Sequence, residues 1–325
     1  MADNKQEVVV LPREEPEEPA EPVQKNQFDL STIDPDEVDV DLSHTRADHI
    51  PDLSRFQKMD DLRLRNNLLT VINPTLTPLV SLTSLDLYEN QLTEIANLET
   101  LVNLNSLDLS YNRIRRISGL ETLVNLHTLY LVHNKIEKIE NLDTLTGLRL
   151  LELGDNKIRK IENIEHLTNL EHLFLGKNKI RQLEGLGSLH KLKSLSVPGN
   201  RLVKIENLEE LKNLEELYLS DQGLQDIHGV ECLSNLLILD VANNEIKTFA
   251  GVEKLEELGD FWANDNKVEN FSEIEYLAKL PHLETVYLER NPFYHHDTAQ
   301  YRRKVMMALT QVKQIDATSC RKYTS

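Results

Sequence analysis

Residues 104–125 read LNSLDLSYNRIRRISGLETLVN, and residues 126–147 repeat the same pattern as LHTLYLVHNKIEKIENLDTLTG. In both stretches Leu or Ile returns at the same seven positions, and an Asn follows three residues after the L-x-L core. The same polar marker recurs at every twenty-second position over much of the chain. The markers are Asn90, Asn112, Asn134, Asn156, Asn178, Asn200, Gln222, Asn244 and Asn266. A single 22-residue period therefore organises most of the sequence.

A period of 22 residues with an L-x-L-x-x-N core is the signature of leucine-rich repeats. Strand side chains alternate, so Leu107 and Leu109 are expected to face the core and Asp108 the solvent. We predict an α/β leucine-rich-repeat solenoid with a curved parallel sheet on its concave face and short 3₁₀ or irregular returns on its convex face. The marker Asn should bond backbone groups of its own turn and of the neighbouring turn. Gln222 in that place predicts one looser turn.

The solenoid is predicted to cover residues 42–291, with about eleven repeats and a degenerate first unit. In that first unit Val40, Leu42, Ile50 and Leu53 take the apolar places, and Thr45 takes the place of Asn. A solenoid without caps exposes a leucine face at each end. The first unit is therefore expected to cap the N-terminal end.

Residues 292–325 are predicted to form a helical C-terminal cap. Asp297 fits the N-cap position of a helix, with Gln300 three residues later. Apolar residues then follow at helical spacing, and Val312 and Ile315 are expected to complete the cover. The helical positions are Tyr301, Val305, Met306 and Leu309.

Residues 1–41 hold thirteen acidic and three basic residues, together with five of the eleven prolines. Such a composition cannot bury enough apolar area to offset the entropy of ordering, so we predict a disordered acidic tail. It is either a docking or phosphorylated arm or a segment that only promotes solubility.

Charge and cysteine content exclude several classes of function. The chain carries a formal net charge of −18, which disfavours duplex nucleic acid and anionic membrane surfaces as ligands. No apolar run approaches the roughly 18 to 20 residues of a membrane span, and the N-terminal segment lacks the pattern of a secretory signal. Cys232 and Cys320, far apart in sequence, are expected to be reduced thiols of an intracellular protein.

No catalytic, cofactor or metal motif is present in the sequence, so we predict a protein that is not an enzyme and needs no cofactor. The pair His295 and His296 has no further ligands at zinc spacing and is interpreted as surface histidines. A basic flank beside the Asn turns is interpreted as a solvated edge or a second contact surface. It contains Lys157, Arg159, Lys160, Lys177, Lys179 and Arg181.

The concave wall is the expected binding face, and the middle residue of each L-x-L forms its central column. That column alternates acids with large aromatic residues, which are the types that anchor protein interfaces, while the acids would orient a basic partner. Gly154, Gly176 and Ala242 beside it leave room for close approach. The alternative is that these are ordinary solvated strand positions, which also suit Tyr, Thr and Phe. The column holds Arg63, Asp86, Asp108, Tyr130, Glu152, Phe174, Ser196, Tyr218, Asp240, Trp262 and Tyr287.

The closing segment Glu284–Pro292 reads ETVYLERNP, and the tail continues with QYRRKV at 300–305 and QIDAT at 314–318. With the unbroken 22-residue repeats and their Ile-Glu-Asn-Leu returns, these segments resemble the leucine-rich-repeat regulatory subunits of protein phosphatase 1. The resemblance covers roughly residues 42–320. It implies a nuclear and cytoplasmic scaffold that holds the phosphatase catalytic subunit against its concave face and controls its activity, maturation or localisation. A second inhibitor protein joining the complex is a further implication.

Carried onto this chain, the family's contact residues are alternating acids and aromatics of the wall. They fall on Asp108, Tyr130, Glu152, Phe174, Asp240, Asp260, Trp262 and Tyr287. The family usually shows Phe where this chain has Tyr130. None of the seven Phe residues, nor Trp262, has Val or Ile two positions before it, so docking should depend on the folded wall and not on a linear peptide. A scaffold of the ciliary, cytoskeletal or spliceosomal 22-residue-repeat classes is the alternative.

Overall fold

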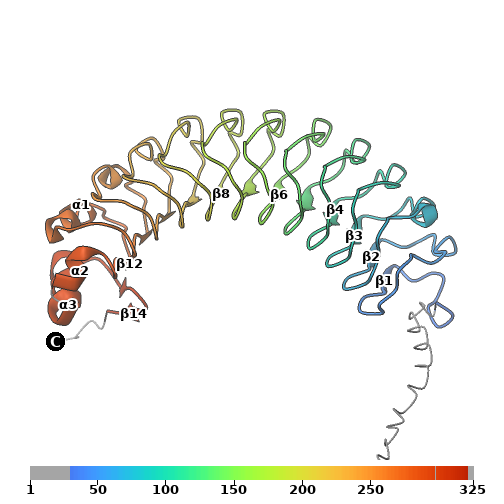
Figure 1. Ribbon diagram of the computed structural model, residues 1–325, viewed down its shortest axis with the longest axis horizontal. Helices are drawn as coiled ribbons and strands as arrows, with labels where there is room; N and C mark the ends of the chain where they lie inside the picture. Colours follow the sequence, from blue (N-terminus) through green and yellow to red (C-terminus); the bar gives the residue numbers. More distant parts are fainter. Residues whose placement is uncertain (1–29, 297, 321–325) are drawn as a thin grey trace, which may run out of the picture.

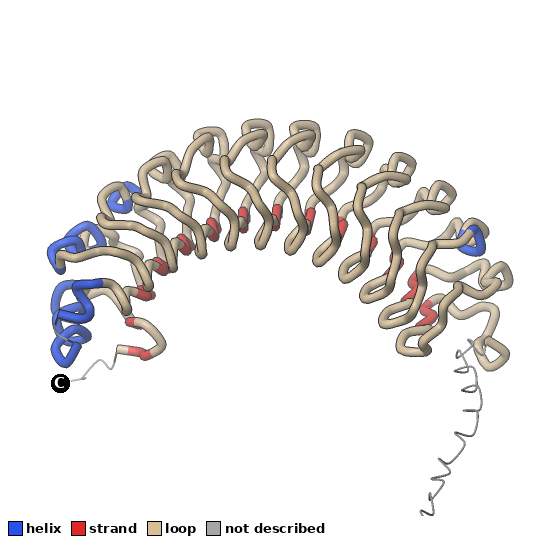
Figure 2. Tube along the Cα trace, in the orientation of Figure 1, coloured by secondary structure: helices blue, strands red, loops and turns tan. Residues whose placement is uncertain are grey.

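The computed structural model describes residues 30–296 and 298–320. The chain winds into an open arc, with one short strand per turn on the inner side and irregular returns on the outer side (Figures 1 and 2). Strands β1 to β13 pair side by side in sequence order and in parallel, and only β14 is antiparallel. This confirms the predicted leucine-rich-repeat solenoid with a parallel sheet on its concave face.

Each strand is two or three residues long, and only a few short helices occur in the described residues. The strands are β1 (Asp39–Asp41), β2 (Asp61–Arg63), β3 (Ser84–Asp86), β4 (Ser106–Asp108), β5 (Thr128–Tyr130), β6 (Leu150–Glu152), β7 (His172–Phe174), β8 (Ser194–Ser196), β9 (Glu216–Tyr218), β10 (Ile238–Asp240), β11 (Asp260–Trp262), β12 (Thr285–Tyr287), β13 (Gln314–Ile315) and β14 (Thr318–Ser319). The helices are η1 (Pro74–Leu76), η2 (Val252–Lys254), η3 (Phe271–Glu273), α1 (Ile274–Leu277), α2 (Pro292–His296) and α3 (Thr298–Ala308).

The core is a continuous stack of aliphatic side chains between the sheet and the outer returns. Leu107 in β4 and Leu109 just after it are fully buried, as are Ile114 and Ile117 on the return. Asp108 between the two leucines faces the inner side of the arc. The alternation read from the sequence therefore decides which residues the concave face presents.

The marker Asn side chains form a buried ladder that joins successive repeats. Asn112 donates through Nδ2 to the carbonyl oxygens of Leu87 in the preceding repeat (3.0 Å) and of Leu109 (3.1 Å) and Ser110 (3.1 Å) in its own turn. Its Oδ1 accepts the backbone N–H of Leu92 at 2.9 Å. One amide thus satisfies four backbone groups of a turn that is closed to water, as predicted.

Gln222 makes the hydrogen bonds of the ladder that join it to the preceding repeat, but not those to the carbonyl oxygens of its own turn. Its Oε1 accepts the backbone N–H of Leu202 at 2.9 Å, and its Nε2 donates to the carbonyl of Val197. Within the described residues it makes no bond to the carbonyls of Leu219 and Ser220, which an Asn in the ladder would reach. The longer side chain overshoots these two acceptors, which is the loosening that the sequence predicts.

The folded chain begins earlier than the boundary at residue 42. Strand β1 (Asp39–Asp41) pairs with β2, and Val40 is 1% exposed. Leu30 and Ile33 also pack against the core. The prediction of a tail through residue 41 is therefore wrong for residues 30–41, and Val40 takes the apolar place that the first unit assigns to it. The remainder of the predicted tail, residues 1–29, lies outside the described residues.

The C-terminal end is closed by α2 and α3, which lie against the last turn (Figure 1). Tyr301, Val305 and Leu309 are buried against the core, as their helical spacing predicts. Strands β13 and β14 then extend the sheet beyond β12, an addition that the repeat pattern did not indicate. The predicted N-cap Asp297 and residues 321–325 lie outside the described residues.

Among the helices of the described residues, none has the length and apolar content that crossing a membrane requires.

Candidate functional site

The inner face of the arc carries all eight predicted site residues. The last residue of each strand from β2 to β12 stands in one column, because neighbouring strands pair residue to residue. Seven of the eight residues belong to this column. The eighth, Asp260, opens β11 and lies two residues from Trp262 on the same face. We call this face the concave wall.

Four of the eight form one group on consecutive strands β4 to β7, namely Asp108, Tyr130, Glu152 and Phe174. Beside them the wall has a hollow of about 370 Å³, lined by Glu152, Phe174, Gly154 and Gly176 among others. A Cβ at Gly176 would approach Pro198 Cγ to 3.1 Å, and one at Gly154 would approach Glu152 Oε1 to 3.1 Å. A side chain at either glycine would crowd this part of the wall.

A second group of aromatic side chains lies towards the C-terminal end of the wall. The ring of Trp262 is 6.1 Å from the ring of Tyr218 and 6.0 Å from that of Tyr287, centroid to centroid. Tyr218 was not among the predicted site residues, although it stands in the same column. Tyr218 is a member of the column predicted from the sequence and lies two strands from Trp262, with Asp240 between them, but the column does not specify which rings touch.

The wall carboxylates also serve the turn that follows each strand. Asp108 Oδ1 accepts the backbone N–H of Ser110 at 2.8 Å, and Asp240 Oδ1 accepts that of Ala242 at 3.0 Å. Asp86 makes the same bond to Tyr88 at 3.0 Å. Sequence reasoning assigned Asp108 and Asp240 to a partner, but one oxygen of each of the three carboxylates also closes the turn that follows its strand, and the other oxygen of Asp86 pairs with Arg65.

The carboxyl groups of Asp108, Asp240 and Glu152 are largely removed from water. Burial raises the pKa of Asp108 and of Asp240, and burial together with nearby Asp108 raises the pKa of Glu152 to about 7. In the described part of the chain, none of the three forms a salt bridge. Asp86, by contrast, pairs with Arg65 at the N-terminal end of the wall. The central wall therefore holds desolvated acids that an incoming cation would stabilise.

Trp262 carries a further unsatisfied group. Its indole Nε1 is buried and has no hydrogen-bond partner among the described residues. Hollows of about 460 Å³ and 240 Å³ adjoin the ring, the first lined by Asp240, Asp265 and Arg290 and the second by Asn264 and Tyr287. A buried donor without an acceptor is costly, so a movement of the ring on binding that gives the indole N–H an acceptor from a partner would lower the free energy.

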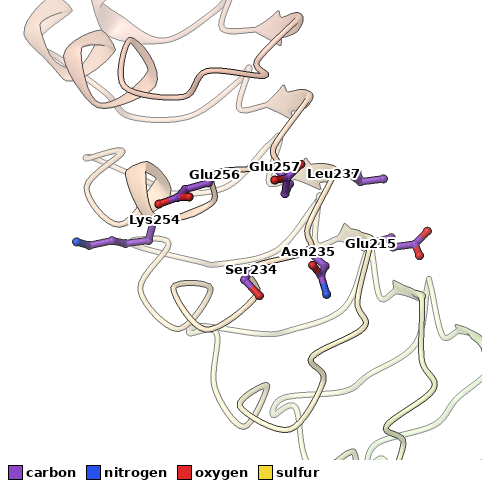
Figure 3. Close-up of a pocket in the computed structure, with 7 residues that line it drawn as sticks. All are labelled: Glu215, Ser234, Asn235, Leu237, Lys254, Glu256 and Glu257. Carbon is purple, nitrogen blue, oxygen red and sulfur yellow. The ribbon is translucent and has the colours of Figure 1, made fainter.

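A larger hollow, of about 630 Å³, lies away from the concave wall on the flank where β9 to β11 begin. Figure 3 shows its lining of acidic and polar side chains, with Lys254 at one edge and Leu237 at the opposite edge. It contains no aromatic residue and no buried unpartnered group. The anchors that a tight protein interface needs are therefore on the wall and not in this hollow.

No group of three or more His, Cys, Asp and Glu within residues 30–296 and 298–320 is placed to hold a metal ion. His295 and His296 are exposed at the end of α2.

Comparisons with known proteins agree with the fold and with the resemblance. Three models of leucine-rich repeats match residues 57–114, 102–144 and 150–248. The protein phosphatase 1 regulatory subunit SDS22 homolog of Caenorhabditis elegans is 74% identical over 97 residues, which is 30% of each chain. Protein phosphatase 1 regulatory subunit 7 of Homo sapiens is 67% identical over 39 residues, 12% of this chain and 10% of that protein. The matches thus span less than a third of these relatives' length. They confirm the resemblance read from the sequence.

Solved structures confirm the architecture alone. A leucine-rich-repeat protein of Leptospira interrogans superposes with a TM-score of 0.76 at 24% identity, covering 91% of this chain and 83% of that one. An internalin of Listeria monocytogenes gives a TM-score of 0.71 at 22% identity and covers 87% of both chains.

Proposed function

Because this chain is a leucine-rich-repeat protein and is similar to regulatory subunits of protein phosphatase 1, we propose that it binds the catalytic subunit of that phosphatase through its concave wall. In this role it is a non-catalytic regulatory subunit. The relatives carry that description in their names, and their matched segments are 74% and 67% identical to this chain.

The main observation behind the proposal is that carboxylates without a salt bridge and large aromatic side chains lie together on the concave wall. Trp262 stands between two tyrosine rings with an unsatisfied N–H, and buried Asp240 lies on the strand between Tyr218 and Trp262 without a cation. A partner that brings basic side chains, apolar side chains and an acceptor for the indole N–H satisfies all three. Aromatic residues that are surrounded by other contacts in this way dominate the energetics of protein interfaces.

The resemblance extends the proposal to what binding achieves. The chain would control the activity, maturation or localisation of the catalytic subunit in the nucleus and cytoplasm, and a second inhibitor protein would join the complex. Co-purification of the tagged chain from nuclear and cytoplasmic extracts tests where the complex occurs and whether a second inhibitor protein belongs to it. Recovery of cytoskeletal or splicing proteins without the phosphatase would contradict the proposal.

Calorimetric titration of the full chain into purified phosphatase catalytic subunit tests the binding face. Trp262→Ala is expected to weaken binding tenfold or more, which corresponds to about 1.4 kcal/mol. Leu237→Ala is the matched control, because Leu237 is 43% exposed on the flank and lies off the wall. It should bind like the unmodified chain.

If binding is tight and Trp262→Ala leaves the affinity unchanged, the interface lies elsewhere than on the concave wall. Titrations with metal-loaded and with metal-depleted phosphatase separate two causes of a negative result. Binding to neither form at micromolar concentrations would show that the partner is another protein.

A further inference from the structure

A row of cations runs along the flank that follows the Asn turns. It consists of the residue directly after the marker Asn in five consecutive repeats, namely Arg113, Lys135, Lys157, Lys179 and Arg201. The backbone N–H of Lys157 donates to the carbonyl of Ile136 at 2.8 Å, and that of Lys179 to Ile158 at 2.8 Å. The other members make the equivalent bond, so the five residues stand at equivalent positions one repeat apart along the arc, and we call them the basic row.

The basic row lacks carboxylate partners. Among the residues that the structure describes, none of its five side chains forms a salt bridge or a hydrogen bond to an acid. Arg115, Arg159 and Arg181, two residues further along their repeats, are exposed and also without such a partner. Later in the same row the acid Glu245 does occur, and Lys267 in the next repeat approaches it to 4.0 Å. The spacing therefore allows ion pairs, and no acid stands at the row position in these five repeats, although Glu137 lies two residues after Lys135, between Arg115 and Arg159.

The basic row concentrates like charges on one flank of the chain. Repeats are roughly 4.8 Å apart, so neighbouring cations repel each other at a distance where opposite charges would attract. The chain as a whole has a net charge of −18, yet the row gathers positive charge in one place. Gln91 ends the row on one side and Gly223 on the other. A polyanion bound along the row would relieve the repulsion.

The basic row is narrow, and acids lie on both sides of it. On the convex side Glu140 pairs with Arg116 at 2.9 Å, and Glu184 pairs with Lys160 at 3.6 Å. On the concave side lie the carboxylates of the wall, including Glu152. A nucleic-acid duplex is wider than this stripe and would press its second strand against acids, whereas one extended peptide chain covers the row alone.

We propose that the basic row is a docking surface for an extended acidic polypeptide segment of a partner protein. Five cations at about 4.8 Å intervals span about 19 Å, which an extended strand of six or seven residues covers at about 3.3 Å per residue. The row and the concave wall are different faces, so both can be occupied at once. Binding there would add a second partner to a complex assembled on the wall.

Fluorescence anisotropy with a labelled peptide of twelve glutamates tests the proposal on the full chain. Lys135→Gln, Lys157→Gln and Lys179→Gln combined should raise the Kd at low salt at least tenfold and flatten its dependence on salt. The matched control removes three exposed lysines elsewhere, Lys212, Lys254 and Lys279, and changes the net charge equally. This control should bind the peptide within twofold of the unmodified chain. Circular dichroism confirms that both variants fold.

Three outcomes would overturn the proposal. Equal loss in both variants would mean that only net charge matters. Tighter binding of a single-stranded oligonucleotide of equal charge, lost in the row variant, would assign the row to nucleic acid. Tenfold tighter peptide binding after Glu14, Glu15, Glu17, Glu18 and Glu21 are all changed to Gln would show that the chain's own acids occupy the row.

Discussion

At the scale of one residue, Glu152 shows why the free wall favours a basic partner: its carboxylate is costly to ionise until a cation binds beside it. Its carboxylate is partly buried between Tyr130 and Phe174 on the neighbouring strands, with no cation beside it in the described structure. Folding therefore raises its pKa from 4.5 to about 7. The group is harder to ionise in the free protein than in a complex that brings a cation. The free chain carries a cost that a basic partner removes.

The raised pKa of Glu152 predicts how the free energy of unfolding depends on pH. Because the pKa of Glu152 is higher in the folded state, the folded state gains protons relative to the unfolded chain, and stability falls as pH rises from about 4.5 to about 7. Glu152→Gln should therefore stabilise the chain at pH 8 by about 1 to 2 kcal/mol and have little effect at pH 4. Urea denaturation at the two pH values measures the difference. An equal effect at both would show that ionisation of Glu152 is not the cause.

At the scale of the structural element, the convex turns hold a second amide ladder that sequence reasoning overlooked. Asn141 and Asn163 adopt positive φ, and each donates to a carbonyl of the preceding repeat at 2.6 and 2.7 Å. Gly119, Gly185 and Gly229 take the same place in other repeats. An exchange of Asn with Gly at one position of the period indicates a left-handed turn, so the signal was present in the sequence.

The most constrained of these turns is at Gly229, where φ is +106° and a Cβ would lie 2.3 Å from the carbonyl oxygen of Ile205. Gly229→Ala is expected to cost about 2 to 4 kcal/mol, because backbone must move. Gly187→Ala is the control, since a Cβ there meets no atom within 4 Å. Thermal and urea denaturation compare the two. Equal stabilities would show that the turn at Gly229 accommodates a side chain.

The Asn turns of the inner edge allow the opposite kind of prediction. Gln222→Asn should restore the bonds to the carbonyls of Leu219 and Ser220 and stabilise the chain by about 1 kcal/mol. The reverse change, Asn112→Gln, removes the corresponding bonds at 3.1 Å and should destabilise it by a similar amount. Denaturant midpoints measure both. Destabilisation by Gln222→Asn would mean that this repeat has adapted its backbone to the longer side chain.

At the scale of the whole molecule, the sequence predicted the features that recur in every repeat, but not those at the ends of the solenoid or those that depend on single side chains. The column of buried leucines and the alternation at Asp108 placed all eight candidate residues on one face. The predicted boundary at residue 42 left strand β1 outside the solenoid although Val40 belongs to the first unit, and strands β13 and β14 escaped prediction because they lie where the 22-residue period ends. The contact between Tyr218 and Trp262 escaped for another reason. It depends on side-chain conformations across Asp240, which no periodicity specifies.

The one-dimensional construction of the solenoid predicts how it unfolds. Each strand contacts only its neighbours, so the stability of the last repeats depends on the cap formed by α2 and α3. Val305→Ala combined with Leu309→Ala removes buried side chains of that cap and should cost about 3 to 5 kcal/mol locally. The terminal repeats should then unfold before the rest. Met307→Ala, on the same helix but 70% exposed, should change little.

Trp262 makes this order of events observable, because it is the only Trp of the chain and lies on β11, with only β12 to β14 of the sheet beyond it. In the unmodified chain its fluorescence and the circular dichroism of the whole solenoid should change at the same urea concentration. In the double cap variant the fluorescence midpoint should fall below the circular dichroism midpoint. Coincident midpoints in that variant would show that the repeats unfold as one unit. The cap substitutions would then lower the stability of the repeat at β2 as much as that of the last repeats. Separate midpoints would mean that the cap also maintains the aromatic group of the wall, since Trp262 and Tyr287 belong to the repeats that unfold first.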